Sequence, residues 1–111
     1  MTMDSMFETL ADPTRRRIVE ALLAGEQPVK ALVDAVDIRQ SGVSRHLRIL
    51  REAGFVDVRA DGQLRLYRLR PEPFREIDLW VSRYRRLWEA RFDALEDALQ
   101  RKRADTTPPR S

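Results

Sequence analysis

The chain begins with apolar residues at helical spacing. Pairs three or four residues apart recur through the first 24 residues: Phe7 and Leu10, Ile18 and Leu22, and Val19 and Leu23. This spacing predicts two amphipathic helices. Ser5, followed three residues later by Glu8, has the pattern of a capping box and predicts that the first helix covers about residues 5–11.

Proline and glycine mark the next boundaries. Asp12 and Pro13 predict the cap and first residue of the second helix, because proline's missing N–H is harmless at that position. Gly25 predicts the end of that helix. Pro28 opens a short third helix through the segment VKALVDAV, whose valines and leucine recur at helical spacing.

A fourth helix is predicted from about Gln40 to Gly54. Its apolar residues Val43, Leu47 and Leu50 stand at positions i, i+4 and i+7 and form one buried stripe. Only residues 37–39 separate this helix from the third. A short helix, a tight connection and a second helix make up a helix-turn-helix.

The next segment predicts a β-hairpin. Val56 and Val58 alternate with polar residues, and a second run, LRLYRL, follows the pair Asp61-Gly62. An Asp-Gly pair between two such runs favours a type I′ turn, which needs positive φ angles. A hairpin directly after a helix-turn-helix makes the fold a winged one.

The C-terminal third predicts one long helix over about residues 73–102, roughly 45 Å at 1.5 Å per residue. One small domain cannot cover that length, so we interpret its apolar seam, together with Phe7 of the first helix, as a dimer interface. A helix folded back on its own core is the alternative. The interface residues are Phe7, Phe74, Ile77, Val81, Tyr84, Trp88, Phe92 and Leu95.

These elements predict a mainly α fold: four helices, a two-stranded wing and a long C-terminal dimerisation helix. Residues 1–103 form one winged helix-turn-helix domain, and residues 104–111 a disordered tail. A chain of 111 residues suits a single core of modest size.

Charge is concentrated in the middle of the chain. The net charge is +3, but residues 39–70 hold eight basic and three acidic side chains, whereas residues 1–38 hold four and seven. Such a field attracts a polyanion, although a solvated charged face is equally compatible with it. No cysteine is present, no apolar run approaches the roughly 20 residues of a membrane span, and the N-terminus lacks a signal-peptide layout. We therefore expect a cytoplasmic protein with no membrane association.

The fourth helix carries the candidate recognition residues. At 100° per residue, the side opposite the buried stripe holds polar side chains suited to a DNA major groove, because arginine can pair with guanine and glutamine with adenine. These residues are Gln40, Ser41, Ser44, Arg45 and Arg48. Gly42 on the first turn would permit close approach of a DNA backbone, or it is there by chance.

The wing supplies a second set. Strand alternation places the residues Arg59, Gly62, Gln63 and Arg65 near the tip, where a wing contacts the minor groove or its phosphates. Solvation of a strand face would explain the same arginines. The partner predicted from both sets is double-stranded DNA.

Catalytic chemistry is not expected. His46, the single histidine, adjoins the buried stripe and is interpreted as a packing residue; without cysteine or a second histidine the chain assembles neither a thiolate zinc site nor a nucleophile–base pair. We therefore predict no enzyme activity, no catalytic residue, no cofactor and no metal ligand. The aromatic residues of the long helix are interpreted as packing residues, with an effector pocket between subunits as the alternative.

Three segments together, LADPTRRRIVEALL, SGVSRHLRILREAGFV and DGQLRLYRL, resemble the ArsR/SmtB-type family of bacterial winged helix-turn-helix repressors. The likeness covers about residues 7–69. It implies a homodimer built through the first and last helices, with Ser41, Ser44, Arg45 and Arg48 in the major groove and the hairpin as the wing. It also implies repression of an operon that includes the protein's own gene.

The chain departs from the metal sensors of that family. The third helix lacks their cysteine cluster, and the last helix offers Asp78 but no histidine. The expected trigger is therefore an unidentified small-molecule effector, or none. Arg39 stands where relatives often have a capping serine, so either Asp37 caps the fourth helix or the helix starts with an arginine that faces a phosphate. Two alternative functions are a winged-helix module that binds protein or RNA, and a metal-responsive repressor that uses carboxylates alone.

Overall fold

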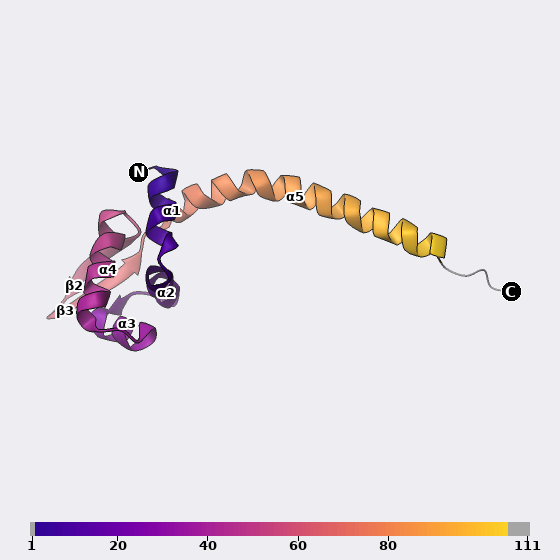
Figure 1. Cartoon of the computed structure of the whole chain (residues 1–111). Helices are drawn as coiled ribbons and strands as arrows, with labels where there is room; N and C mark the ends of the chain where they lie inside the picture. Colours follow the sequence, from indigo (N-terminus) through magenta and orange to yellow (C-terminus); the bar gives the residue numbers. More distant parts are fainter. Residues whose placement is uncertain (1, 107–111) are drawn as a thin grey trace. The chain divides into compact units, whose positions relative to one another are not determined.

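The computed structural model describes residues 2–106, which form five helices and three short strands (Figure 1). The chain consists of two units, one ending at Ile77 and the other beginning at Asp78. The first unit contains the four N-terminal helices, the sheet and the first turns of the last helix. None of the helices in residues 2–106 is long and apolar enough to cross a bilayer.

Helix α1 (Met3–Ala11) begins earlier than the sequence predicts. Its cap is Thr2, whose hydroxyl oxygen accepts a hydrogen bond from the backbone N–H of Ser5 at 3.1 Å. Ser5 lies within the first turn, and its own hydroxyl donates to the carbonyl of Thr2 at 2.8 Å. The capping box predicted at Ser5 is therefore wrong, because the extended residue that a cap requires is Thr2.

Helix α2 (Pro13–Leu22) starts as predicted. Asp12 is extended, and its Oδ1 accepts hydrogen bonds from the N–H groups of Thr14 at 2.8 Å and Arg15 at 3.1 Å. These bonds satisfy two of the helix's unpaired donors. They also lower the pKa of Asp12, the bond from Arg15 most strongly, and this outweighs the opposing effect of desolvation.

Two arginines of α2 close the C-terminal end of α1. Arg15 donates from Nε to the carbonyl of Thr9 at 2.6 Å, and Arg16 donates to the carbonyls of Leu10 at 2.7 Å and Ala11 at 3.0 Å. Cationic donors favour the negative end of a helix dipole. Two of the three arginines at 15–17 therefore stabilise the C-terminal end of α1.

The sheet has three strands, one more than predicted. Strand β1 (Gln27–Pro28) pairs antiparallel with β3 (Leu64–Leu69), which pairs antiparallel with β2 (Val56–Asp61), giving the order β1-β3-β2. Helix α3 (Val29–Val36) follows β1 directly, with Pro28 as its N-cap residue. A two-residue strand containing proline leaves no alternating pattern in the sequence, and proline is tolerated because β1 is an edge strand.

The hairpin is present, but its turn differs from the prediction. Asp61 is the last residue of β2 and pairs with Leu64, so the two loop residues are Gly62 and Gln63. Gly62 has φ of 62°, whereas Gln63 is not among the residues with positive φ. Positive φ at the first loop residue alone is the pattern of a type II′ turn, so the predicted type I′ turn is wrong.

The core of the first unit gathers apolar residues from every helix up to α4 (Gln40–Glu52) and from the start of the hairpin. Phe55, directly after α4, is fully buried and meets Phe74 edge to face at 5.3 Å between ring centroids. The buried residues are Met6, Ile18, Val19, Leu22, Leu32, Val36, Val43, Leu47, Leu50, Phe55 and Val56.

Helix α5 (Pro71–Thr106) is one continuous helix, as predicted, and extends beyond both expected ends. Residues 104–106 are helical, so that part of the predicted tail is wrong; the rest of the tail, 107–111, lies outside the described residues. Phe74 and Ile77 were predicted in the dimer interface but pack against the core of their own unit. Their positions just after β3 keep them within reach of that core.

We expect Asp12→Ala to lower the free energy of unfolding by about 1 kcal/mol at pH 7, the usual cost of losing an N-cap. The pKa of Asp12 is lowered in the folded state, so its stabilising effect is present above the ordinary value of 3.8 and is lost as the pH falls through the lower, folded value. Urea denaturation at several pH values measures both effects.

Asp12→Asn is the matched control, because asparagine caps a helix about as well as aspartate but does not titrate. It should retain most of the stability at pH 7 and show a weaker loss on acidification. Equal stability of wild type and Asp12→Ala at pH 7 would contradict this role for the cap.

Candidate nucleic-acid interface

Helix α4 separates its apolar and polar residues onto opposite sides. Val43, Leu47 and Leu50 are buried, and the helix contacts α2, α3 and β2. The five predicted recognition residues are all exposed, which confirms the predicted division of the helix: Gln40, Ser41, Ser44, Arg45 and Arg48. Within residues 2–106 their side chains form no hydrogen bond or ion pair, so they are available to an external ligand.

The connection between α3 and α4 fixes where that polar face begins. Asp37 adopts the left-handed conformation with φ of 54°, and its N–H donates to the carbonyl of Val33 at 3.0 Å. Asp37 therefore closes α3 and does not cap α4. Arg39 is the N-cap residue of α4 and makes no side-chain capping bond, and its side chain is exposed.

Gly42 has an explanation within the fold. A Cβ atom at this position would lie 3.3 Å from Cδ1 of Ile38, which packs against the core. The missing side chain thus lets the connecting turn fit closely against the first turn of α4. This accounts for the glycine without a DNA backbone.

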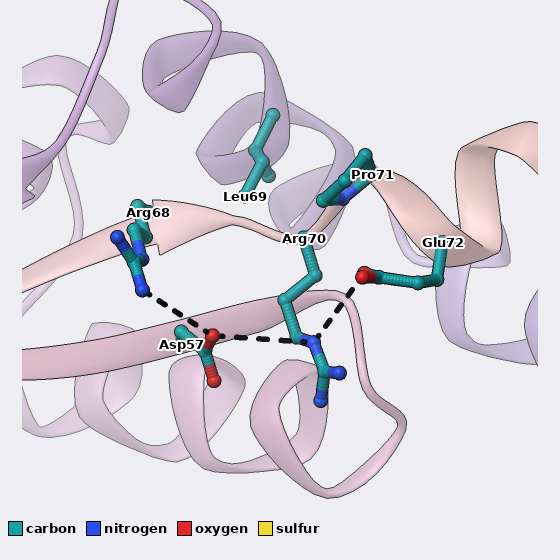
Figure 2. Close-up of a pocket in the computed structure, with 6 residues that line it drawn as sticks. All are labelled: Asp57, Arg68, Leu69, Arg70, Pro71 and Glu72. Atoms are coloured by element: carbon teal, nitrogen blue, oxygen red, sulfur yellow. Dashed lines mark ion pairs between the residues drawn. The ribbon is translucent and has the colours of Figure 1, made fainter.

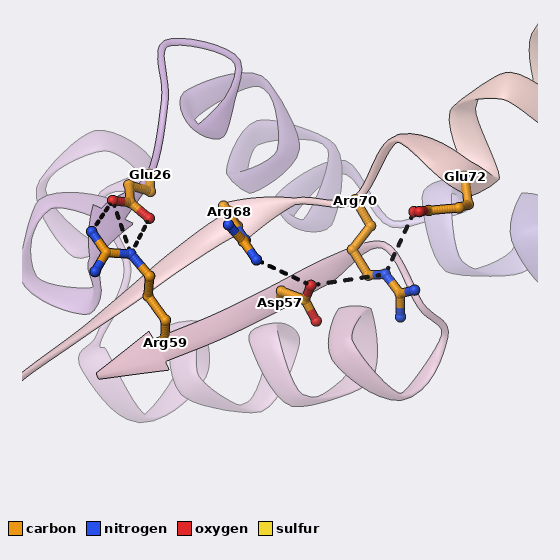
Figure 3. Close-up of polar contacts among 6 residues, drawn as sticks. All are labelled: Glu26, Asp57, Arg59, Arg68, Arg70 and Glu72. Carbon is orange, nitrogen blue, oxygen red and sulfur yellow. Dashed lines mark hydrogen bonds and ion pairs between the residues drawn. The ribbon is translucent and has the colours of Figure 1, made fainter. Parts of the chain in front are cut away.

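Most arginines of the hairpin meet a carboxylate, and Figure 3 shows these pairs. Arg59 was predicted near the tip, and this prediction is wrong, because Arg59 pairs in register with Leu66 in the middle of the hairpin. Its guanidinium meets the carboxylate of Glu26, with Nε 2.9 Å from Oε2 and 3.1 Å from Oε1. Its Nη2 also contacts Oε1. The tip itself carries Gly62, Gln63 and Arg65, all exposed as predicted.

The bidentate contact shifts the pKa of both Glu26 and Arg59. The hydrogen bonds from Arg59 lower the pKa of Glu26 more than desolvation raises it, and the same bonds raise the pKa of Arg59. Glu26 lies in the loop between α2 and β1, so this pair ties the middle of β2 to the helical body. This pair could not be predicted from local sequence patterns, since the two residues are 33 positions apart.

The arginines at the base of the hairpin are also paired with carboxylates (Figure 2). The Asp57 carboxylate lies 3.9 Å from Arg68, its cross-strand partner, and 4.0 Å from Arg70, which in turn lies 3.5 Å from Glu72. These residues line a shallow cavity of about 280 Å³ together with Leu69 and Pro71. Of the wing's arginines, Arg65 alone among the described residues is left without a carboxylate partner.

His46 lies on the buried side of α4, in agreement with its interpretation as a packing residue. Its Nδ1 is 3.5 Å from Nη1 of Arg15, the arginine that also bonds to the end of α1. Arg15 therefore connects α1, α2 and α4. This role of Arg15 could not be predicted, because nothing in the spacing of Arg15 and His46 shows that they meet.

The arrangement defines a class of protein. A short helix, a tight turn and a second helix with a free polar face are followed by a hairpin with a basic tip, which together make a winged helix-turn-helix. Comparison with protein families agrees: residues 10–59 match the model described as a helix-turn-helix domain.

Among curated proteins, the chain is 40% identical over 83 residues to the arsenic resistance transcriptional regulator ArsR1 of Pseudomonas putida, covering 74% of this chain and 62% of that protein. It is 40% identical over 79 residues to the arsenical resistance operon repressor of Escherichia coli, covering 70% and 64%. The chain thus spans less than two thirds of each of these two relatives.

Two solved structures extend the comparison. The structure of a possible transcriptional regulator for arsenical resistance is 39% identical, with a TM-score of 0.62, covering 96% of this chain and all of that one. The homodimeric winged helix-turn-helix DNA-binding domain of a possible ArsR-family regulator from Mycobacterium bovis is 26% identical, with a TM-score of 0.62, covering 71% and 74%. The chain belongs to the ArsR family of winged helix-turn-helix transcriptional regulators.

We expect the Glu26 carboxyl to titrate below its ordinary pKa of 4.5, because the Arg59 guanidinium stabilises its ionised form. In Arg59→Ala the midpoint should rise towards 4.5. NMR titration of the side-chain carboxyl carbon measures both. Identical midpoints in wild type and variant would show that the pair does not persist in solution. Arg65→Ala, which removes an unpaired arginine from the neighbouring strand, is the control and should leave the midpoint in place.

Proposed function

We propose that this protein is a homodimeric repressor that binds a palindromic DNA operator and blocks transcription from it. The observation that carries the proposal is the exposed face of α4, on which five polar side chains have no partner in the described chain. Because the opposite face is buried in the core, this face projects from a rigid support. The two curated relatives described above are a transcriptional regulator and an operon repressor.

The positions of the polar residues along α4 suggest which of them contact bases and which contact phosphates. Residues in the first turns of a recognition helix reach base edges, so Gln40, Ser41, Ser44 and Arg45 read sequence. A bidentate Arg45–guanine pair contributes about 1–3 kcal/mol of discrimination. Arg48 and Arg51, further along the helix, neutralise phosphates. The exposed Arg39 at the start of α4 adds a further phosphate contact.

The wing adds affinity with little sequence preference. Gly62 and Gln63 form a narrow turn, and Arg65 follows two residues later with a free guanidinium. At the tip these groups fit the minor groove and its flanking phosphates. Arg59 contributes indirectly, because its contact with Glu26 fixes the inclination of the hairpin.

A second copy of the chain completes the binding unit. The apolar side chains of α5 beyond Ile77 are largely exposed, and so is Phe7 on α1. The homodimeric Mycobacterium bovis domain supports the same assembly. Two recognition helices about 34 Å apart would then contact successive major grooves on one side of a duplex.

A repressor of this kind acts in the cytoplasm, without enzymatic chemistry of its own and without a membrane. Residues 1–103 act as one regulatory domain. Release from DNA would follow binding of a small-molecule effector, for which α5 and its aromatic residues offer apolar contacts.

The expected effects of two arginine substitutions differ in kind. Arg45→Ala should lower the preference for operator over random DNA by about tenfold or more, because a base contact is lost. Arg65→Ala should weaken binding to both DNAs alike and reduce the slope of log affinity against log salt by about 1, because one phosphate contact is lost. Fluorescence anisotropy across a salt series measures both.

Arg75→Ala is the matched control, an exposed arginine outside α4 and the wing, and should bind both DNAs like wild type. Wild-type affinity and specificity in the Arg45→Ala and Arg65→Ala variants would contradict the proposed interface.

A further inference from the structure

His46 is a buried ionisable side chain on α4 that the proposed function does not use. It is 8% exposed and follows Arg45 directly, on the buried side of the helix. Within residues 2–106, its contact with Arg15 is the one polar side-chain link between α4 and the other helices. The apolar residues of α4 hold the helix by packing alone, so this contact is the directional part of its attachment.

The guanidinium of Arg15 has three partners, one for each nitrogen. Nε donates to the carbonyl of Thr9 at 2.6 Å and Nη2 to the carbonyl of Glu8 at 3.4 Å, both at the C-terminal end of α1. Nη1 lies 3.5 Å from Nδ1 of His46. Because the bonds to α1 fix the guanidinium, the imidazole of His46 packs beside a cation that is held in place.

The protonation state of His46 decides whether this contact is favourable. A guanidinium can only donate, so Nδ1 must accept, which requires a neutral imidazole with its proton on Nε2. In the imidazolium, Nδ1 also carries a proton, and a second cation then lies 3.5 Å from the guanidinium. Charges in a partly buried site are screened less than charges at a surface, so the protonated ring should move away from Arg15.

The charges around His46 oppose each other. The Asp12 carboxylate interacts with His46 and favours the imidazolium, whereas Arg15 disfavours it. Asp12 forms no ion pair or hydrogen bond with His46, so Arg15 is the nearer charge and repulsion prevails. The other charged side chains of α2, α3 and β2, which pack against α4, are exposed, except Asp57, which is paired with arginines. The titratable ones among the exposed are Glu20, Lys30, Asp34 and Asp61.

We infer that Arg15 is a positioning residue for DNA recognition that acts through neutral His46, and that protonation of His46 lowers the preference of α4 for its operator. This rests on the proposed function and adds the residue pair that holds the recognition helix. A set of binding side chains must be kept within about 0.5 Å of its productive geometry. His46 adjoins Arg45 and is two residues from Ser44, so a displaced imidazole shifts the part of α4 that carries both.

The contact also determines the sign of the pH dependence. Histidine is the side chain that changes charge between about pH 5 and 8. The preference for operator is complete at the alkaline end, where the imidazole is neutral, and falls as the pH is lowered through this range. A gain of positive charge alone would strengthen binding to operator and random DNA alike. The ratio of the two affinities therefore isolates the effect of position.

Fluorescence anisotropy at about pH 8 and about pH 5.5 tests the inference. The probes are the duplex that the wild-type protein enriches from random sequences at the higher pH, and a scrambled duplex of the same composition. We expect the wild-type preference to fall about tenfold on acidification, the equivalent of one lost base contact. His46→Asn supplies an amide oxygen that accepts but does not titrate, so its preference should be the same at both pH values.

Arginine variants separate this role from the closing of α1. Arg15→Gln removes the charge that repels the imidazolium, so its preference should be lower than that of wild type at about pH 8 and independent of pH. Arg15→Lys keeps the charge without the planar fork, so its preference should also be lower but should still fall on acidification. Arg16→Gln is the matched control, because Arg16 bonds to the same end of α1 but not to His46. It should behave like wild type at both pH values.

A wild-type preference that does not change with pH would overturn the inference. An equal fall in His46→Asn, or loss of the pH dependence in Arg16→Gln, would overturn it too. Thermal unfolding at both pH values checks the fold of each variant. His46→Asn leaves the bonds from Arg15 to α1 in place, so it decides the question even if Arg15→Gln does not fold. Absence of any preference in the wild-type protein at about pH 8 would instead overturn the proposed function.

Discussion

The burial of one stripe of α4 constrains the remainder of the binding surface. Val43, Leu47 and Leu50 are packed into a core that the other helices and Phe55 complete. Rotating α4 about its axis would expose that stripe and bury arginines, and a buried unpaired charge costs far more than any gain in packing. The polar face is therefore held in one direction by the hydrophobic effect, and the proposed recognition of base edges depends on this rigid presentation.

Arginine has two distinct roles in this protein. Arg15 and Arg16 satisfy the carbonyls at the end of α1, Arg59 holds Glu26, and Arg70 lies between Asp57 and Glu72. These residues position elements. Arg45, Arg48 and Arg65 have no partner within the described chain. A net positive charge alone does not distinguish the two groups, whereas their surroundings do. Only arginines without a partner in the described chain, Arg39 and Arg51 included, are available to neutralise phosphates or read bases.

Much of this could be predicted from local patterns. The spacing of Val43, Leu47 and Leu50 gave α4 and its polar face, and Asp12-Pro13 gave the start of α2. Features that depend on contacts distant in sequence could not be predicted: β1 exists only because β3 lies beside it, and the Arg59 guanidinium is paired because Glu26, 33 positions away, lies within hydrogen-bond distance of it. The type II′ turn was missed because the strand register, and not the Asp-Gly pair, decides which residues form the loop.

The most direct measurement is selection of bound sites from random duplex DNA by the purified protein. We expect enrichment of a twofold-symmetric motif whose half-sites are centred about one helical turn apart. A variant that replaces Gln40, Ser44 and Arg45 by alanine should lose this preference. Enrichment of no duplex sequence, or of the same motif by that variant, would contradict recognition through α4.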